Sequence, residues 1–528
     1  MCKKGTFFMT SEQIQIIVAM CVYMAAVVFI GIFYSKRANR SSEDYFLGGR
    51  TLGPWVTAMS AEASDMSGWL LMGLPGVAYW CGLADAAWTA IGLAAGTYIN
   101  WLLVSKRLRR YSVRTNAITL PEFFSNRYRE KKKIILSISA IFILVFFTVY
   151  ASSCFVTCGK LFSALFDADY TVMMIIGAVF VVAYTLLGGF LAESISDFFQ
   201  AIIMVVALAV VVIVGTINAG GIGAVIENSQ NIPGFLEFFG MASPELGADG
   251  AQTVINGVPQ FGEAAKYGAL TVCSTLAWGL GYFGMPQVLL RFMAIRKEGE
   301  LKRSRRIAVV WVVISLAVAV FIGLIGRTLE PTAHLTSASS ENIFITLSTG
   351  LLPAVLAGFV MAGILAATMS SSDSYLLIAA SAFSKNIFQG LFKKNATDKQ
   401  VMLMSRITLL VLSVIGVIIA IDENSVIFQI VSFAWAGFGA TFGPLVLFSL
   451  FWKRATRAGA IAGMLSGGIV VFVWKLLLKP MGGVFGIYEL LPAFIVSCIF
   501  IVVVSLLTKK PSKEIEDDFE AAKSGEIE

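Results

Sequence analysis

A short polar run interrupts a long apolar stretch at residues 62–68, which contain Glu62, Asp65, Ser67 and Gly68. A carboxylate inside hydrocarbon costs roughly 2.5–3.5 kcal/mol on insertion scales, so an acid placed there indicates a function. Asp, Ser and Gly also favour leaving a helix, because they compete with its regular hydrogen bonding. A helix interrupted at mid-membrane exposes carbonyls and half-helix ends, which can hold a cation and a small polar solute. We therefore interpret this stretch as a transport site.

The acid Asp65 has three interpretations: it ligates a cation, it orients the break, or it caps a half-helix. Unwinding would also free main-chain carbonyls, such as those of Ala63 and Met66. Carbonyl oxygens are ligands that suit a hard cation such as Na⁺. Trp69 directly follows Gly68, and it is either a wall of the binding site or a residue that packs against lipid or a neighbouring helix.

A second polar run, Ser370–Ser374, contains Asp373 among four serines inside another apolar stretch. Small residues recur every four positions upstream of it, and for 358–366 this stripe predicts close helix–helix packing. Packing does not require Asp373 or two adjacent hydroxyls. The hydroxyls of Ser370 and Ser371, with the carbonyl of Ala367, would complete an all-oxygen Na⁺ shell if this helix crosses the break at residues 62–68.

A third interruption is the glycine-rich segment 279–284, which carries Tyr282 and lies between Trp278 and Pro286. Its aromatic side chains either face lipid or enclose a small apolar ring. Paired, interrupted spans in two halves of a chain are a pattern typical of transporters with inverted repeats. A further intramembrane acid, Asp197, holds another cation, supports the first site, or lies near the cytoplasmic surface.

The composition predicts an all-α polytopic membrane protein. The 528 residues are 57% hydrophobic and only 14% charged, whereas soluble proteins have about a quarter charged residues. About 13 apolar runs lie between residues 14 and 508, and most are long enough to cross a bilayer core of about 30 Å. The first run, 14–34, is predicted to be a retained helix, because no small-residue cleavage site follows it.

Charge asymmetry predicts the orientation in a cell membrane. Most of the 40 Lys and Arg residues fall in alternate loops and in the tail, which places those loops and the C-terminus in the cytoplasm and the N-terminus outside. We expect the basic residues of 106–133 and 291–306 to lie at lipid headgroups, so nucleic acid is not a predicted partner. The polar tail 509–528 is predicted to be disordered. The sequence predicts no particular oligomeric state.

Two other classes of function are disfavoured. A channel would be expected to show a pore-lining stripe of like charges, and none is evident. An intramembrane hydrolase would need a nucleophile and a base, but the single histidine, His334, lies in a hydrophilic connection. Asp65 and Asp373 would need to share a proton to act as an acid pair. No enzymatic activity is predicted.

Four motifs resemble those of the sodium/solute symporter family, and most closely its sodium/proline symporter branch. They are YFLGGRTLGPW at 45–55, SDMSGWLLMGLPG at 64–76, LAWGLGYFGMPQVLLRFMA at 276–294 and AATMSSSDS at 366–374. The resemblance covers about 30 to 508, and the motif at 64–76 is specific to the proline branch. It implies Na⁺-driven import of L-proline by alternating access across the lipid bilayer. A Na⁺ symporter of another amino acid, a sugar acid or a vitamin is the alternative.

The resemblance also implies a fold and a set of site residues. The fold is a LeuT-type 5+5 inverted repeat of about 13 transmembrane helices, with one extra N-terminal and two extra C-terminal helices. Its parts are the N-terminal helix and loop (1–51), the first repeat (52–219), an extracellular loop (220–267), the second repeat (268–452), two C-terminal helices (453–508) and a cytoplasmic tail (509–528). Carried over residue by residue, the Na⁺ ligands are Ala63, Met66, Ala367, Ser370 and Ser371. The substrate pocket is Ser67, Gly68, Trp69, Tyr150, Trp278, Tyr282 and Pro286. Arg50 matches a gating position.

Two positions depart from the family pattern. Ser371 stands where proline transporters have Thr, which keeps the hydroxyl. Asp373 replaces a Ser and adds a charge near the cation site. Asp65 is expected to support the first Na⁺ site, and Asp197, Asp373 and Ser374 are candidates for a second one.

Overall fold

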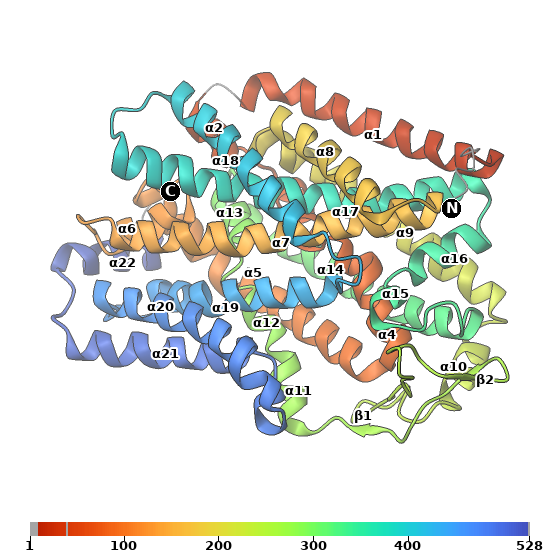
Figure 1. Cartoon of the computed structure of the whole chain (residues 1–528). Coiled ribbons are helices and arrows are strands. Elements are labelled where there is room, and N and C mark those ends of the chain that lie inside the picture. The colour runs from red at the N-terminus through yellow and green to blue at the C-terminus, as the bar shows by residue number, and fades with distance from the viewer. Residues whose placement is uncertain (1–8, 39–40, 526–528) are drawn as a thin grey trace.

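The computed structural model describes residues 9–38 and 41–525, which form a long bundle of helices that run side by side (Figure 1). The helices are α1 (Ser11–Ala38), α2 (Ser42–Leu47), α3 (Pro54–Asp65), α4 (Leu74–Cys81), α5 (Leu83–Arg114), α6 (Leu120–Arg127), α7 (Ile134–Phe166), α8 (Tyr170–Leu187), α9 (Phe190–Asn218), α10 (Ile222–Gln230), α11 (Ala269–Leu276), α12 (Trp278–Gly281), α13 (Pro286–Ala294), α14 (Leu301–Leu329), α15 (Ser337–Ser340), α16 (Ile343–Leu351), α17 (Ala354–Ser381), α18 (Asp398–Ile419), α19 (Ile427–Phe451), α20 (Arg457–Val473), α21 (Leu490–Leu507) and α22 (Lys513–Ser524). Two short antiparallel pairs join β1 (Gly240–Met241) to β4 (Ala265–Lys266) and β2 (Val254–Ile255) to β3 (Val258–Pro259).

Ten helices within the described residues are long and apolar enough to cross a membrane. The other three predicted crossings correspond to the shorter apolar helix α8 and to two interrupted segments, α3 to α4 and α11 to α13. The all-helical membrane fold is therefore confirmed, and the count of 13 crossings stays a prediction. One predicted run is divided, because 343–386 contains α16 and then α17, which begins after Pro353.

Proline and glycine determine where the two interrupted segments break. Pro54 occupies the first turn of α3, and α3 ends at Asp65 before Ser67 and Gly68. In the second segment, Met285 is extended, with φ −75° and ψ 109°, and Pro286 begins α13. Proline disfavours helical geometry in the residue before it and suits the first position of a new helix. The sequence thus interrupts both segments inside the bundle.

Helix α17 lies inside the bundle and packs against α1, α7 and α9. Its small residues allow the close approach: a methyl group built at Gly358 would lie 2.7 Å from the Ile16 carbonyl oxygen of α1, and one at Gly363 would lie 2.6 Å from Ala207 of α9. The predicted packing role of 358–366 is confirmed. These contacts hold α17 against α1 and α9, and its serine run lies in the interior of the bundle.

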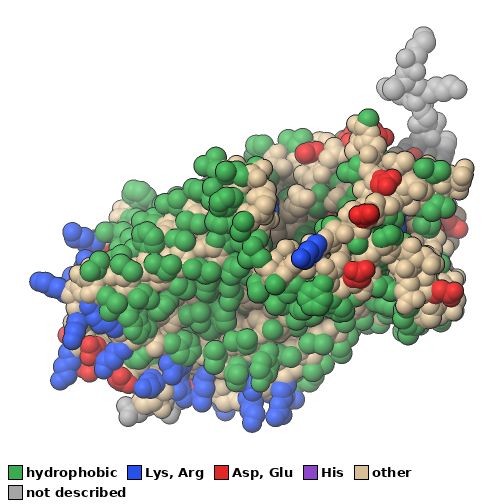
Figure 2. Space-filling view, turned by 90° about the horizontal axis from the view of Figure 1, so that it is seen from below, with side chains coloured by type: hydrophobic (Ala, Val, Ile, Leu, Met, Phe, Trp, Pro, Cys, Tyr) green, Lys and Arg blue, Asp and Glu red, His purple; other side chains and the backbone are tan. Residues whose placement is uncertain are grey.

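Many Lys and Arg side chains gather toward one end of the molecule, and Asp and Glu side chains are more frequent toward the other end (Figure 2). We call the end that carries α10 and β1–β4 the loop end, and the end that carries α6 and α22 the basic end. At the loop end, a buried ion pair joins Lys160 of α7 to Glu341, with 2.6 Å between Nζ and Oε2. Glu341 also accepts hydrogen bonds from the main-chain N–H groups of Ile427 and Phe428, at the start of α19. One carboxylate therefore ties the 330–342 connection to two helices.

The tail forms a docked helix, α22, so the prediction of disorder for 509–528 is wrong over Lys513–Ser524. The carboxylate of Asp518 pairs with Arg114 of α5 and with Arg129, at 2.8 and 2.9 Å. Partial burial opposes ionisation of Asp518, yet the hydrogen bonds from both arginines hold its pKa below the usual value. Phe519 is buried beneath the helix. The tail folds because the basic end offers a partner that its local composition does not reveal.

Three arginines predicted to lie at lipid headgroups are buried instead. Arg109 and Arg127 are 5% and 1% exposed, and Arg291 is fully buried. The first two donate to the main-chain carbonyls of Ile295 and Ser449. A guanidinium with several fixed donors can satisfy such carbonyls, which are left over where helices end. Arg109 and Arg127 therefore connect the loops of the basic end to the bundle.

Candidate functional site

The break in the second predicted span is where sequence analysis placed it. Helix α3 ends at Asp65, Met66 has φ −91° and ψ 81°, and a π-helical turn at Trp69–Gly73 leads into α4. All of residues 57–76 are buried. The last regular bond runs from the Met66 N–H to the Glu62 carbonyl. Beyond it the regular pattern is lost, because the Ser67 N–H donates to the Asp65 carbonyl, only two residues earlier, at 3.2 Å.

Four of the five predicted Na⁺ ligands meet at this break. The Ser370 hydroxyl donates to the Ala63 carbonyl oxygen at 2.8 Å and to that of Ala367 at 3.2 Å. The Ser371 hydroxyl lies 3.2 Å from the same Ala63 oxygen. The predicted crossing of 62–68 by 367–371 is therefore confirmed. The fifth predicted ligand, Met66, lies at the break, and no hydrogen bond from the described residues reaches its carbonyl.

Two carbonyls and two hydroxyls from α3 and α17 form an all-oxygen set of the type that hard cations take. Both hydroxyls now use their protons on a carbonyl. A cation placed among them would take lone pairs from all four oxygens, and the hydroxyls would turn their protons away. Because serine hydroxyls rotate freely, this change needs little movement of the backbone. The arrangement can therefore hold a cation that bridges the two helices.

The Asp65 side chain points to the other interrupted segment. Its carboxylate accepts a hydrogen bond from the Tyr282 hydroxyl at 2.8 Å and a longer one from Gln287 at 3.4 Å. Its main-chain carbonyl accepts bonds from the Trp69 indole at 3.2 Å and from the Tyr150 hydroxyl at 3.3 Å. Asp65 thus connects both breaks. Of the three interpretations, the geometry fits orientation of the break.

Aromatic rings enclose the segment around Asp65. Tyr150 stacks on Tyr375 with 4.2 Å between ring centroids, and Tyr282 meets Trp435 edge to face at 5.0 Å. The Ser67 hydroxyl is buried and has no hydrogen-bond partner among the described residues. An unpaired buried hydroxyl beside aromatic faces suits a small ligand that has a polar group and an apolar ring.

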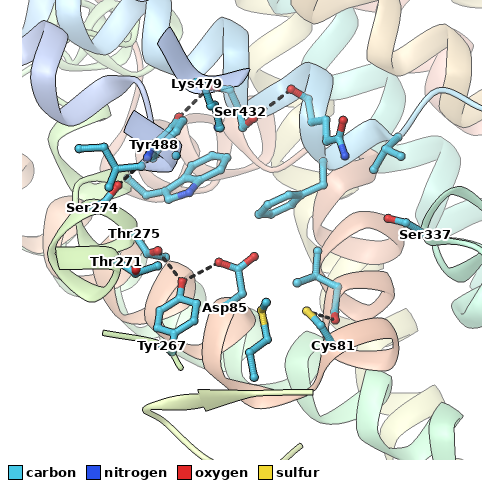
Figure 3. A pocket seen from close by; sticks show the side chains of 18 of the residues that line it. Cys81, Asp85, Tyr267, Thr271, Ser274, Thr275, Ser337, Ser432, Lys479 and Tyr488 are labelled. Atoms are coloured by element: carbon cyan, nitrogen blue, oxygen red, sulfur yellow. Dashed lines mark hydrogen bonds between the residues drawn. The ribbon is translucent and has the colours of Figure 1, made fainter. Parts of the chain in front are cut away.

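Gly68 and Pro286 are both buried at the breaks, whereas Trp278 lies apart from them. A methyl group at Gly68 would lie 2.3 Å from the Thr157 Oγ1, so the break packs tightly on α7. Pro286 is buried at the start of α13. Trp278 lines a separate cavity of about 540 Å³ at the loop end, shown in Figure 3. Its carbonyl accepts the indole N–H of Trp435 at 2.8 Å, which links the cavity wall to the rings around Tyr282.

A buried charge cluster lies around Asp197. Arg291 of α13 pairs with Glu193 and with Asp197, the latter at 3.1 Å, and donates to the Ser374 hydroxyl at 2.8 Å. Ser374 donates in turn to Glu193. Ser60 of α3 donates to Asp197 at 2.7 Å. Asp197 is fully buried, and its neighbours come from α3, α13 and α17.

Carboxyl groups outnumber the guanidinium in this cluster. Asp373 lies on the same helix as Ser374 and accepts its main-chain N–H at 2.7 Å. With Glu193 and Asp197 it makes three carboxyl groups to one guanidinium. One oxygen of each carboxyl group is buried and unpaired among the described residues. Buried charge of one sign needs a counter-ion or a proton, so the cluster has capacity for a further cation.

Arg50 is held in the connection between α2 and α3. Its guanidinium donates to the carbonyls of Met293 at 2.7 Å and Ala117 at 2.6 Å, and to the Ser112 hydroxyl at 3.0 Å. Burial, followed by the neighbouring Arg109, lowers the pKa of Arg50 to about 10, so it stays charged at neutral pH. Arg50 therefore ties the start of α3 to α5 and α13 at the basic end.

Sequence reasoning missed four residues of this site: Glu193, Arg291, Tyr375 and Trp435. A signal existed for Glu193, because Glu193 and Asp197 are four residues apart and share a helix face, and two such acids in a membrane require a counter-charge. Arg291 was assigned to the lipid headgroups with the rest of 291–306. For Tyr375 and Trp435 no local signal separates a site ring from a packing ring.

Comparison with known proteins places this geometry in a family. The model of the Sodium:solute symporter family matches residues 45–467. The sodium/proline symporter of Staphylococcus aureus (strain USA300) is 41% identical over 511 residues, which cover 96% of this chain and 95% of that protein. An outward-open, substrate-bound Na⁺-coupled sialic acid symporter, described as revealing a novel Na⁺ site, has a TM-score of 0.73 at 17% identity and covers 94% of this chain and 99% of that one. Mhp1, a nucleobase-cation-symport-1 transporter with bromovinylhydantoin bound, has a TM-score of 0.52 at 12% identity and covers 90% and 98%.

The likeness to these solved structures confirms the predicted LeuT-type fold. The relatives and the family are transporters that use Na⁺ as the coupling ion. In this chain two helices meet through serine hydroxyls and a main-chain carbonyl at a broken backbone. The chain therefore belongs to the sodium:solute symporter family and is a multi-pass membrane transporter of a small molecule coupled to Na⁺.

Proposed function

We propose that the protein imports L-proline together with Na⁺ by alternating access. The observation that carries this proposal is the contact of the Ser370 and Ser371 hydroxyls with the Ala63 carbonyl, two residues before Asp65 in the ring-lined segment. Ion and solute sites that share one broken helix are coupled, because ordering the break for one prepares it for the other. The name of the 41% identical relatives supports proline as the solute.

In this mechanism Na⁺ binds first and bridges α3 and α17 through Ala63, Ala367, Ser370 and Ser371. We include the Met66 carbonyl as the fifth ligand, reached when the break adjusts. Bridging holds α3 in the arrangement that receives the solute. Asp65 acts as the supporting residue, because its carboxylate connects the ion site to Tyr282 on the opposite break.

The solute then docks between the two breaks. The end of α3 is the negative pole of a half-helix and suits the ammonium group of an amino acid, and the start of α13 at Pro286 is positive and suits its carboxylate. The Ser67 hydroxyl and the main chain at Gly68 supply polar contacts. The pyrrolidine ring rests on Trp69, Tyr150 and Tyr282, and Trp278 closes the pocket toward the loop end.

A second Na⁺ binds among the carboxyl groups beside Arg291. Its ligands are Asp197, Asp373 and Ser374, with Glu193 added by the structure. The unpaired oxygens of the three acids support this assignment. The sialic acid symporter of the same fold is described as revealing a novel Na⁺ site, which supports looking for one beyond Ser370 and Ser371.

The proposed topology assigns the basic end to the cytoplasm of the cell. The C-terminal helix and most of the Lys and Arg side chains lie there, and loops rich in these residues are retained inside. The repeats are then 52–219 and 268–452, with α1 before them, 220–267 as the external loop, and α20 and α21 after them. Arg50 gates the inner side. One Na⁺ that crosses ~100 mV gains about 2.3 kcal/mol, which supports roughly fifty-fold accumulation of solute.

Uptake of labelled L-proline by proteoliposomes tests the proposal. An inward Na⁺ gradient should drive accumulation above equilibrium, and an equal K⁺ gradient should not. The double substitution Ser370→Ala with Ser371→Ala should abolish the difference between the ions. Ser466→Ala is the matched control, since within the described residues the Ser466 hydroxyl bonds only to the Gly463 carbonyl of its own helix.

Equal uptake in Na⁺ and K⁺ would refute Na⁺ coupling of proline. Competition by a panel of amino acids, sugar acids and vitamins identifies the solute. If one of these displaces labelled proline at a much lower concentration than proline itself, the transporter is a Na⁺ symporter of that solute.

A further inference from the structure

A cavity of about 380 Å³ lies at the basic end, where α20 begins, α21 ends and α22 begins. Figure 1 shows these three helices at the same end of the molecule, with α20 and α21 side by side. Its walls are residues 455–458, the connection 508–512, Ile515 of α22 and Tyr128. The volume falls in the range of small-molecule sites, about 300–1,000 Å³. No residue of the ion and solute sites lines this cavity, so it calls for a different ligand.

Every charged side chain that lines the cavity is basic. These side chains are Arg457, Lys509 and Lys510. Within the part of the chain that the structure describes, none of them forms an ion pair. The nearby acids of α22 are engaged elsewhere, because Glu514 pairs with Arg129 at 2.7 Å and Glu516 with Lys453 at 3.4 Å. The cavity therefore keeps an uncompensated positive charge, which favours an anion.

Hydrogen bonds fix the walls of the cavity. The Thr456 and Thr508 hydroxyls bond to each other at 2.9 Å, and the Thr456 N–H donates to the Ser505 hydroxyl at 3.1 Å. Arg454 donates to the Thr508 carbonyl at 2.7 Å, and its Nη1 is buried without a hydrogen-bond partner among the described residues. The start of α20 is thus tied to the end of α21. A further guanidinium lies behind this wall and adds to its positive charge.

The position of the cavity along the helices indicates which anion it takes. Helices α20 and α21 are both apolar enough to cross a membrane, and α21 ends at Leu507, which is 82% exposed. An exposed leucine at the end of a spanning helix lies in hydrocarbon, so Lys509 and Lys510, directly beyond it, lie at the depth of the lipid headgroups. A lipid bound here places its phosphate in the cavity and its acyl chains along exposed side chains of α21 such as Val503.

We propose that this cavity binds the headgroup of an anionic phospholipid, whose phosphodiester contacts Arg457, Lys509 and Lys510. Basic pockets between membrane helices are suited to such headgroups. The site also joins the lipid to the tail, because Ser512, the N-cap residue of α22, is part of the wall. A bound headgroup therefore stabilises the docked tail. A negative membrane surface without such a site has the opposite effect, since it repels the acidic helix α22.

Hydrogen exchange of residues 513–524 tests the inference. The full chain is placed in nanodiscs of phosphatidylcholine alone or with added phosphatidylglycerol. Because the complete cavity exists only while α22 is docked, phosphatidylglycerol at about ten times its dissociation constant should slow exchange about tenfold by mass action. The double substitution Lys509→Gln with Lys510→Gln should abolish the slowing. Lys131→Gln with Lys132→Gln is the matched control, since it removes the same charge from an exposed loop of the basic end that does not line the cavity.

A second variant and two soluble probes define the ligand. Arg457→Gln should weaken binding of phosphatidylglycerol to the detergent-solubilised chain about fivefold, as expected for one basic residue at an anionic surface. Native mass spectrometry across a lipid titration measures this affinity. Inorganic phosphate and glycerol 3-phosphate carry the anion without acyl chains, so they should slow exchange of 513–524 far less than phosphatidylglycerol does. Equal slowing by either probe would assign the cavity to a soluble anion and overturn the lipid site.

The remaining results are equally decisive. Unchanged or faster exchange in phosphatidylglycerol overturns the inference, and so does loss of the slowing in the Lys131→Gln, Lys132→Gln control, because surface charge alone would then explain the effect. The melting temperature of each variant in phosphatidylcholine reports its folding. If the Lys509→Gln, Lys510→Gln protein does not fold, Arg457→Gln decides: wild-type affinity for phosphatidylglycerol in that variant refutes the site. None of these measurements uses proline or Na⁺, so they stand apart from the test of the proposed function.

Discussion

The Ser370 hydroxyl contacts two carbonyls of the proposed ion site, those of Ala63 and Ala367. Ser370→Ala should raise the Na⁺ concentration for half-maximal uptake about tenfold, because one oxygen ligand contributes on the order of 1–2 kcal/mol. The maximal rate should change less, since the break and the aromatic pocket stay in place. The measurement is initial uptake across a series of Na⁺ concentrations at fixed ionic strength.

Ser371→Thr serves as the comparison, because it keeps the hydroxyl near the Ala63 carbonyl. Its Na⁺ dependence should stay within about twofold of the wild type. A Ser370→Ala protein with unaltered Na⁺ dependence would show that the hydroxyl holds α3 to α17 without touching the ion.

The single histidine makes stability depend on pH in a defined direction. Burial lowers the pKa of His334 to about 4, where its Nε2 meets the Thr346 hydroxyl at 2.8 Å and its ring packs edge to face on Tyr79. The unfolded chain titrates near the ordinary value of about 6.5. Between these values the unfolded state binds the extra proton, so stability should fall as pH drops from about 6.5 toward 4.

The loss should reach at most about 3 kcal/mol. Melting temperatures in detergent at pH 7 and pH 5 measure it, and His334→Gln should remove that part of the pH dependence. Any acid sensitivity that persists in His334→Gln belongs to other groups. A variant as pH-sensitive as the wild type would exclude the histidine as the cause.

Individual site residues could be predicted where a polar or charged side chain interrupts an apolar run. Asp65, Ser370 and Ser371 stood out because polar groups in hydrocarbon need a reason. Arg291 did not stand out, because an arginine near the end of an apolar run is usual at lipid headgroups. Its partners Glu193 and Asp197 come from a helix about 100 residues earlier, and single-sequence reasoning gives no measure of that contact.

At the scale of elements, the break in the second span depends on a close contact with α7. A methyl group at Gly68 would lie 2.3 Å from the Thr157 Oγ1 and 2.5 Å from its Cγ2. Gly68→Ala should therefore push the break away from α7 and reduce proline affinity about tenfold or more, since displacement by an ångström commonly costs that much. Labelled proline binding in the presence of Na⁺ measures the change.

Gly268→Ala is the matched control, because a methyl group there meets open space and the residue has an ordinary negative φ. Its binding should equal that of the wild type. The double substitution Gly68→Ala with Thr157→Ser removes the contact with Cγ2 and should recover part of the affinity. Normal binding by Gly68→Ala alone would mean that the break tolerates movement.

Elements were predictable where proline and glycine act locally. Pro54 and Pro286 begin half-helices, and the polar run at 65–68 ends one, as expected. The separation of α16 from α17 was missed, because both lie in one apolar run and only Pro353 marks the boundary. Hydropathy reports the environment of a segment and says little about where a helix inside it turns.

For the whole molecule, α22 binds the tail across the loops of the basic end. Phe519 is 5% exposed, whereas Phe392 at another cytoplasm-facing segment in the proposed topology is 77% exposed. Burying a phenylalanine contributes about 2 kcal/mol, so Phe519→Ala should raise the undocked fraction of α22 roughly thirtyfold. The rate of tryptic cleavage at Lys513 and Lys523 measures this fraction.

Phe392→Ala should leave that rate unchanged. High salt should also speed cleavage, because the partly exposed pairs of Asp518 with Arg114 and Arg129 are screened. If both variants are cut at the wild-type rate in low and high salt, the tail is held by something other than its ring and its charges.

The whole-molecule fold was predictable mainly through resemblance. Composition established a helical membrane protein, and motifs placed it in a family with two inverted repeats. The docked tail was not predictable, because α22 is polar by itself and its partners, such as Arg114, Arg129 and Lys453, are distant in the sequence. The two strand pairs within 240–266 were not predicted either, because each strand has only two residues.

The indole of Trp69 donates its N–H to the Asp65 carbonyl, at the point where the backbone leaves the helix. Indole emission shifts when such a bond breaks or water arrives, so the protein contains its own optical reporter of that point. The difference between wild-type and Trp69→Phe spectra isolates this signal from the other tryptophans. Opening of the core during turnover should then be visible in real time, without any attached dye.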